Sequence, residues 1–197
     1  MEEKRNFDLL TLGQVLLRLS PPNNDRLVRG DTFVKQVGGA ELNVAVGVAL
    51  LGLRTGVISK LPSHDMGSFM KGKIRSYGVS DDFFMYDDSP SARVGIYYYE
   101  NGAYPRKPKV IYDRANSSFY SLKIDEIPEK AYTASRCFHT SGITLALSPK
   151  VRETTIEMIK RFKAAGTLVS FDVNFRGNLW TGEEAVSYTH LRAHETD

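Results

Sequence analysis

The sequence lacks several features that would place the protein in a specialised class. Its 197 residues include one cysteine, Cys137, so no internal disulfide framework can form, and the apolar neighbourhood predicts a buried strand thiol. No apolar run is long enough for a signal peptide or a membrane helix, and no Lys/Arg run resembles a nucleic-acid-binding arm. We therefore expect a cytoplasmic protein with no membrane and no nucleic-acid partner.

Motifs for other kinds of site are missing or broken. The Gly-x-Gly-x-x-Gly motif of dinucleotide-binding oxidoreductases does not occur, and the histidines show no metal-ligand spacing, so we expect no metal site in this chain. Residues 67–73 have the Gly-x-x-x-x-Gly-Lys frame of a phosphate-binding loop, but Ile74 replaces its magnesium-binding Ser or Thr. The segment is predicted to be helical, which argues against that motif.

The composition and the alternation of predicted strands and helices are typical of a globular α/β domain. Hydrophobic residues make up 42% of the chain and charged residues 25%, with a net charge of +3 and both signs scattered. Apolar patterns predict strands at 7–12, 15–19, 55–60, 137–140 and 168–172, and helices at 41–51, 66–77 and between a Ser148 cap and Gly166. Strands that alternate with amphipathic helices favour a doubly wound parallel sheet covered on both faces.

One segment does not follow this alternation of strands and helices. Residues 92–113 alternate β-branched and aromatic residues around a Gly/Pro-rich turn at 101–105, which predicts a hairpin set apart from the main sheet. Neighbouring residues of a strand point to opposite faces, so at most alternate members of the run Tyr97, Tyr98 and Tyr99 can share a pocket.

The most informative segment is residues 38–45, Gly-Gly-Ala-Glu-Leu-Asn-Val-Ala. Two glycines before a helix let a ligand approach the backbone, and the helix start offers unpaired N–H groups beside the Asn43 amide. Such a corner suits a polyol. A plain structural turn is the alternative interpretation of the same pattern.

The order Gly-Gly-x-x-x-Asn-x-Ala after two opening strands resembles the sugar-binding signature of the ribokinase-like (PfkB) carbohydrate kinases. Further matches follow in order, and they favour the 2-keto-3-deoxygluconate kinase branch: Gly95-Ile96-Tyr97, Tyr112-Asp113-Arg114, residues 141–149, and Asp172-Val173-Asn174-Phe175-Arg176. The resemblance covers the chain from Phe7 to about Trp180. It implies a three-layer α/β/α fold with a small β-lid, formed by elements near 14–37 and 92–113.

The resemblance also implies site residues, residue by residue. The implied sugar-acid contacts are Gly38, Gly39, Ala40, Glu41, Leu42, Asn43, Tyr97, Tyr112, Asp113, Arg114, Ile143 and Arg176. Asn174, Phe175 and Arg176 are implied to lie near ATP, which the complete kinase would use with Mg²⁺. The lid is further implied to pair between subunits, giving a homo-oligomer.

Two arginines support an acidic substrate on chemical grounds. A keto acid carries a carboxylate, and Arg114 or Arg176 could meet it with charge-assisted hydrogen bonds. A neutral hexose needs no such cation. The alternative is that both arginines lie on solvated faces.

The chain also departs from the family pattern. Gln14 stands where many relatives carry Glu, which leaves the role of that strand end open. The second family signature, Asp-Thr-x-Gly-Ala-Gly-Asp, which supplies the proton-accepting aspartate and a phosphate-holding helix start, has no match. We expect residues 1–185 to be the amino-terminal part of a kinase domain that is truncated before its carboxy-terminal half, with no catalytic base and no turnover of its own.

Two questions stay open at this level. Residues 186–197 show no continuing apolar face and are predicted to be a non-native tail, the alternative being a genuine polar tail. Fructose or another neutral sugar is an alternative substrate for the complete protein, and a non-catalytic sugar-binding module is an alternative role for this chain.

Overall fold

The structure is a computed structural model that describes residues 5–177. The predicted non-native tail at 186–197 lies outside these residues, so that prediction is not tested.

A parallel sheet forms the centre of the molecule. Its strands are β1 (Phe7–Leu12), β4 (Thr55–Pro62), β5 (Val79–Asp87), β8 (Ser135–Ser141) and β9 (Leu168–Asp172), and they lie in the order β5-β4-β1-β8-β9. All neighbouring pairs are parallel. The central strand β1 is apolar because both of its faces are covered, with Leu10 and Leu12 completely buried.

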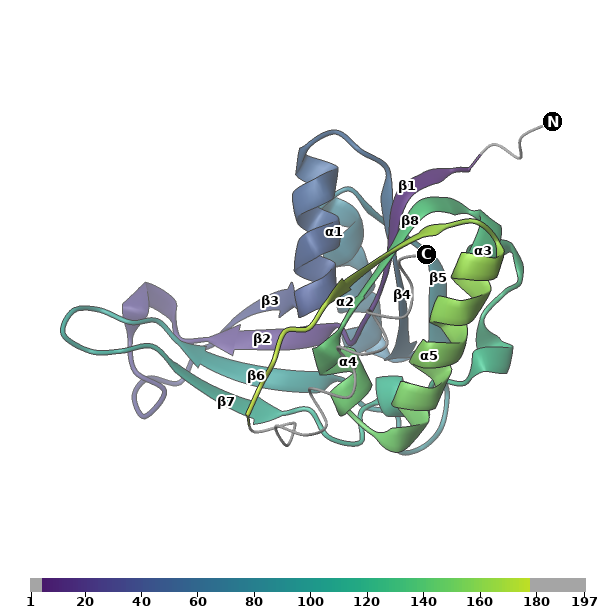
Figure 1. The fold of residues 1–197 in the computed structure, drawn as a ribbon. Coiled ribbons are helices and arrows are strands. Elements are labelled where there is room, and N and C mark those ends of the chain that lie inside the picture. The colour runs from purple at the N-terminus through teal and green to yellow at the C-terminus, as the bar shows by residue number, and fades with distance from the viewer. Residues whose placement is uncertain (1–4, 178–197) are drawn as a thin grey trace.

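Helices cover both faces of this sheet (Figure 1). On one face, α1 (Ala40–Leu50) and α2 (Asp65–Ser76) bury Leu42, Ala45, Met70 and Ile74 against β4 and β5. On the other, α3 (Lys130–Thr133) and α5 (Pro149–Ala164) close a second core, where Phe138 of β8 stacks on Phe162 with ring centroids 4.0 Å apart. The predicted three-layer doubly wound architecture is confirmed.

A second, smaller sheet extends away from the main one (Figure 1). It contains β2 (Leu16–Ser20), β3 (Val34–Gly38), β6 (Gly95–Glu100) and β7 (Lys109–Asp113), in the order β3-β2-β6-β7. Strands β6 and β7 form the predicted antiparallel hairpin. The short elements η1 (Pro22–Asn24), η2 (Ser118–Ser121), η3 (Ile124–Glu126) and α4 (Gly142–Ala146) complete the described chain.

Helix ends follow the capping chemistry that the sequence indicates. The Ser148 hydroxyl accepts a hydrogen bond from the Val151 N–H at 3.2 Å, which starts α5. Gly78 and Gly166 follow α2 and α5 with φ angles of 78° and 71°, a conformation that glycine adopts without strain.

Two local features differ from expectation. Strand β5 has no counterpart among the predicted strands because its acidic residues disfavour a strand locally; in the fold, Lys71 of α2 pairs with Asp81 at 3.2 Å. Leu50 is apolar and lies within the predicted helix at 41–51, but it is 80% exposed, because it lies in the last turn of α1, beyond the buried positions of that helix.

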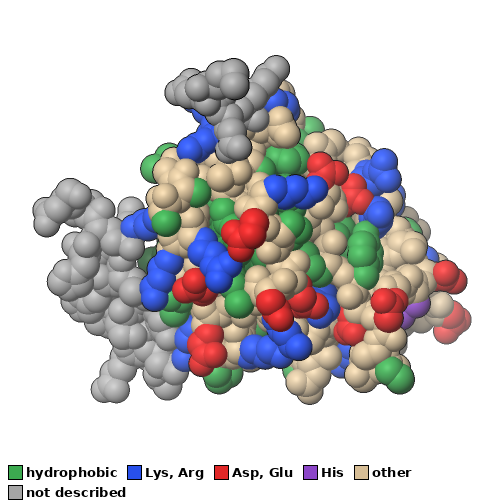
Figure 2. Space-filling view, turned by 90° about the vertical axis from the view of Figure 1, so that its right-hand side faces the viewer, with side chains coloured by type: hydrophobic (Ala, Val, Ile, Leu, Met, Phe, Trp, Pro, Cys, Tyr) green, Lys and Arg blue, Asp and Glu red, His purple; other side chains and the backbone are tan. Residues whose placement is uncertain are grey.

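The surface on the side of α3 and α5 carries interspersed acidic and basic side chains (Figure 2). No patch of a single sign dominates this face. No helix within residues 5–177 is long and apolar enough to cross a bilayer.

Gly67 and Gly72, the two glycines of the incomplete phosphate-binding-loop motif, both lie in α2. They give the first prediction. A Cβ on Gly67 would stand 1.9 Å from the Pro62 carbonyl oxygen, whereas a Cβ on Gly72 would meet nothing within 4 Å. We expect Gly67→Ala to lower the free energy of unfolding by about 1 to 3 kcal/mol through overpacking. Gly72→Ala should leave it unchanged or raise it by up to about 1 kcal/mol. Urea unfolding of both variants tests this, and equal midpoints would contradict it.

Candidate functional site

Several predicted site residues lie at the carboxyl edge of the parallel sheet: the first turn of α1, Ile143 after β8, and residues 174–176 after β9. Gly13 and Gln14 follow β1, Ser141 ends β8 and Asp172 ends β9, while the amino end of α1 begins at the same edge. Ligands of open α/β sheets bind at this edge.

The Gly38-Gly39 corner is tightly packed against the protein itself. A Cβ on Gly38 would stand 2.6 Å from the Tyr97 hydroxyl oxygen, and one on Gly39 would stand 2.6 Å from the Gln14 carbonyl oxygen. Gly39 also has a φ of 150°, which side-chain-bearing residues rarely adopt. At both positions the fold therefore requires glycine, because neighbouring groups of the protein occupy the space that a side chain would need.

The Glu41 side chain points into the protein. It is 2% exposed, and its Oε1 accepts hydrogen bonds from the Ser141 hydroxyl at 2.5 Å and the Thr144 hydroxyl at 2.7 Å. Its Oε2 lies where a side chain on Gly13 would be. The carboxylate thus joins α1 to the ends of β1 and β8 and to α4.

The other side chains of the predicted 38–43 segment differ in their exposure to solvent. The side chain of Leu42 is buried in the core between α1 and the sheet, whereas Asn43 is exposed. Ile143, in the first turn of α4, is partly buried beside the Ser141 and Thr144 hydroxyls that bond Glu41. Sugar contact by these residues stays a prediction, and the Glu41 and Leu42 side chains offer a ligand almost no surface.

Two tyrosines of the small sheet face each other above this corner. Tyr97 and Tyr112 pair across β6 and β7 with ring centroids 6.0 Å apart, and burial raises the pKa of Tyr97. Tyr97 and Gly38, both among the implied sugar contacts, lie next to each other. Asp113 points the other way, as alternation along a strand requires, and pairs with Arg93 at 2.7 Å.

Arg114 is held next to these tyrosines by Gln14. Its Nε donates to the Gln14 Oε1 at 2.7 Å, and its guanidinium carbon lies 5.7 Å from the centre of the Tyr112 ring. Desolvation by burial lowers the pKa of Arg114. Gln14, which stands where many relatives carry Glu, thus has a structural role: its amide oxygen holds the Arg114 side chain.

The predicted ATP-adjacent segment begins at the end of β9. The Asp172 carboxylate accepts a hydrogen bond from the Asn174 N–H at 3.0 Å, and Asn174 has a left-handed φ of 41°. The Phe175 ring is 50% exposed, and the Arg176 Nη1 donates to the Phe175 carbonyl. Within residues 5–177 Arg176 pairs with no carboxylate, so it can meet an anion.

His139 is a residue at this edge that the sequence did not single out. It is buried in β8, and its Nδ1 lies 3.0 Å from the Ser170 hydroxyl oxygen of β9. Desolvation lowers its pKa, while the nearby charges of Glu41 and Asp172 oppose that shift. Its position two residues before the Ser141–Gly142 turn was the only available signal.

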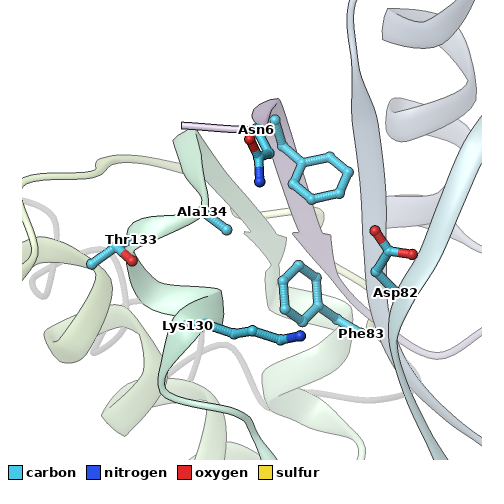
Figure 3. Close-up of a pocket in the computed structure, with 7 residues that line it drawn as sticks. Asn6, Asp82, Phe83, Lys130, Thr133 and Ala134 are labelled. Atoms are coloured by element: carbon cyan, nitrogen blue, oxygen red, sulfur yellow. The ribbon is translucent and has the colours of Figure 1, made fainter. Parts of the chain in front are cut away.

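A separate hollow of about 430 Å³ lies at the opposite edge of the sheet. Asn6, Asp82, Phe83, Lys130 and Ala134 line it, beside the amino end of β1 (Figure 3). None of the residues implicated by the motifs lies there, and parallel sheets bind ligands at the other edge.

The comparisons with known proteins agree with the fold and the site motifs. The model of the pfkB family of carbohydrate kinases matches residues 6–195. The chain belongs to this family. The match extends into the 186–197 segment, whose prediction as a non-native tail stays untested.

Curated relatives carry the names of sugar-acid kinases. A 2-dehydro-3-deoxygalactonokinase from Haloferax volcanii is 39% identical over 178 residues, which is 90% of this chain and 55% of the relative. A 5-dehydro-2-deoxygluconokinase from Listeria monocytogenes is 31% identical over 98% of this chain and 59% of its own length. The chain therefore spans little more than half the length of these relatives.

Solved structures show the same fold. The 2-dehydro-3-deoxygluconokinase of Thermotoga maritima has a TM-score of 0.88 at 37% identity, covering 94% of this chain and 56% of that one. A sugar kinase of Pyrococcus horikoshii in complex with ATP has a TM-score of 0.78 at 26% identity, covering 91% and 58%.

The Glu41 contacts give the second prediction. Glu41→Ala leaves two buried hydroxyls without their acceptor, so the free energy of unfolding should fall by roughly 2 to 4 kcal/mol. Glu153→Ala, which removes an exposed carboxylate from α5, is the matched control and should change little. Chemical denaturation of the two variants measures the difference, and equal losses would contradict it.

The third prediction concerns His139 and acid. Because its folded pKa lies below the ordinary value of 6.5, the unfolded state binds more protons as the pH falls below that value. Stability is then complete above about pH 6.5 and declines below it. We expect His139→Gln to lose less stability than the unmodified chain between about pH 7.5 and about pH 5.5 in thermal unfolding. A steeper acid loss in the variant would contradict this.

Proposed function

We propose that the longer protein containing this chain is an ATP-dependent kinase that phosphorylates a 2-keto-3-deoxy sugar acid on its primary hydroxyl, giving the 6-phosphate. The observation that carries the proposal is Arg114, a partly buried cation beside the glycine corner with no carboxylate partner within residues 5–177. A cation without a counter-ion in a partly desolvated place favours an anionic ligand. The three relatives cited above by name as sugar-acid kinases support the same class of substrate, whereas a fructokinase of Xylella fastidiosa is also among the solved structures with this fold.

The residues of this chain would bind and orient the sugar. The α1 start and the Asn43 amide would meet hydroxyls, Tyr97 and Tyr112 would wall the pocket, and Arg114 would bind the carboxylate. Ile143 would line the far side, next to the turn that Glu41 holds. The small sheet would act as the lid, and pairing of lids between subunits stays a prediction.

ATP would supply the transferring phosphoryl group. The exposed Arg176 and the neighbouring Phe175 fit a nucleotide, since a free guanidinium can bind phosphate oxygens. No group of three acidic, His or Cys side chains suited to a metal occurs within residues 5–177, so Mg²⁺ would come with the phosphates. The proton acceptor is proposed to lie in the length of the relatives that this chain does not span.

The fourth prediction tests this function in the complete kinase that carries these residues. We expect transfer from ATP to 2-keto-3-deoxygluconate, and Arg114→Ala should lower kcat/KM for the acid by about tenfold to a hundredfold by removing a charged hydrogen bond. The effect on the neutral carboxamide of the same sugar should be small. Arg29→Ala, in an exposed loop, is the control. Equal losses for acid and carboxamide would exclude carboxylate recognition by Arg114.

A further inference from the structure

Arg18 of β2 lies on the same face of the small sheet as the two tyrosines of the site. It pairs in register with Tyr97 of β6, and residues paired across neighbouring strands point to the same face. Leu17 and Leu19, on either side of it, point the other way and pack against the core beneath α1 and α2. We call the face that carries Arg18, Tyr97 and Tyr112 the inner face of the small sheet, and the opposite one the outer face.

The two faces carry different charges. The four strands of the small sheet contain two acidic residues, Glu100 and Asp113, and alternation along β6 and β7 places both on the outer face. Arg106 pairs with the first of them and Arg93 with the second. Within these four strands, all of which the structure describes, Arg18 is the only charged side chain on the inner face. The inner face is therefore positive and has no carboxylate of its own.

Arg18 is held by contacts that do not neutralise it. Its Nε donates to the Ser20 hydroxyl at 2.9 Å, and its guanidinium carbon lies 4.3 Å from the centre of the Tyr99 ring. Within residues 5–177 no carboxylate pairs with it, and its terminal nitrogens form no hydrogen bond. A hydroxyl and an aromatic face fix the position of the side chain, and its full charge remains.

The charge of Arg18 acts on the predicted sugar pocket. Burial raises the pKa of Tyr97, and the positive charge of Arg18 opposes that rise. The strand order β2-β6-β7 places Tyr97 between β2, which carries Arg18, and β7, which Arg114 follows. Two guanidinium groups without carboxylate partners therefore lie on either side of one implied sugar contact.

Two unpaired cations around one pocket favour a ligand that is negatively charged. Partly desolvated positive charges are unfavourable to each other, and an anion that binds near both relieves this repulsion. A neutral polyol supplies hydroxyls but no such compensation.

We propose that Arg18 is a further specificity-determining residue, whose positive charge on the inner face of the small sheet adds to that of Arg114 in binding the carboxylate end of an acidic sugar. This inference rests on the proposed function, in which the substrate is a sugar acid. Because the carboxylate is at the opposite end of the sugar from the hydroxyl that is phosphorylated, the charge should act on binding and leave the transfer step unchanged.

The fifth prediction is a selectivity measurement on the complete kinase. We compare kcat and KM for 2-keto-3-deoxygluconate and for its neutral carboxamide in the unmodified enzyme, in Arg18→Met and in Arg18→Lys. Arg18→Met removes the charge and keeps an apolar stem, so KM for the acid should rise about threefold to tenfold, with kcat and the carboxamide KM nearly unchanged. Arg18→Lys keeps the charge and loses the Nε hydrogen bond, so most of the preference for the acid should remain.

Lys35 of β3 provides a matched control on the outer face. It pairs in register with Leu19, and its Nζ lies 4.5 Å from the centre of the Phe69 ring, a cation–ring contact like that of Arg18. Lys35→Met removes one positive charge from the same sheet but on the face away from the pocket. It should leave KM for both the acid and the carboxamide as they were.

The outcomes separate this inference from the function on which it rests. If the unmodified enzyme does not prefer the acid, the proposed substrate class fails and the inference fails with it. If Arg114→Ala loses the preference and Arg18→Met keeps it, the role of Arg18 alone is wrong. Equal rises of KM for acid and carboxamide in Arg18→Met, or an equal loss of preference in Arg18→Lys, would also overturn it. Circular dichroism checks folding, and if Arg18→Met does not fold, Arg18→Gln decides by the same criteria.

Discussion

The arrangement of the site depends on one buried carboxylate. Glu41 would be costly to bury alone, and the hydroxyls of Ser141 and Thr144, about a hundred residues away in sequence, satisfy it. Gly13 leaves the space it occupies. Because Glu41 belongs to α1, Ser141 to β8 and Thr144 to α4, these hydrogen bonds connect the glycine corner to the turn that contains Ile143.

Gln14, the residue after Gly13, connects the small sheet to the surroundings of Glu41. β1 leads through Gly13 and Gln14 directly into β2, and the Gln14 side chain reaches the segment that follows β7. The Gln14 amide therefore connects the segment that leads into β2 with the segment that follows β7. In the small sheet, Tyr97 lies beside Gly38, and Tyr112 pairs with Tyr97 across β6 and β7.

The sequence predicts the layers and the helix ends because those follow local rules: hydrophobic period, a Ser cap and glycines after helices. It does not predict β5, in which Asp81 pairs with Lys71 and Arg75 of α2. Motif matches locate the site, but they do not give the direction of the Glu41 side chain or the partner of Gln14. Those contacts join residues that are 100 or more apart, and no local pattern encodes them.

The two charged side chains at this edge, Glu41 and Arg114, do not pair with each other but are held by neutral groups. Glu41 is bonded by neutral hydroxyls and Arg114 by a neutral amide, although each lies within the other's field. Neutral donors and acceptors hold both groups in place, and within residues 5–177 the guanidinium of Arg114 forms no ion pair with a carboxylate.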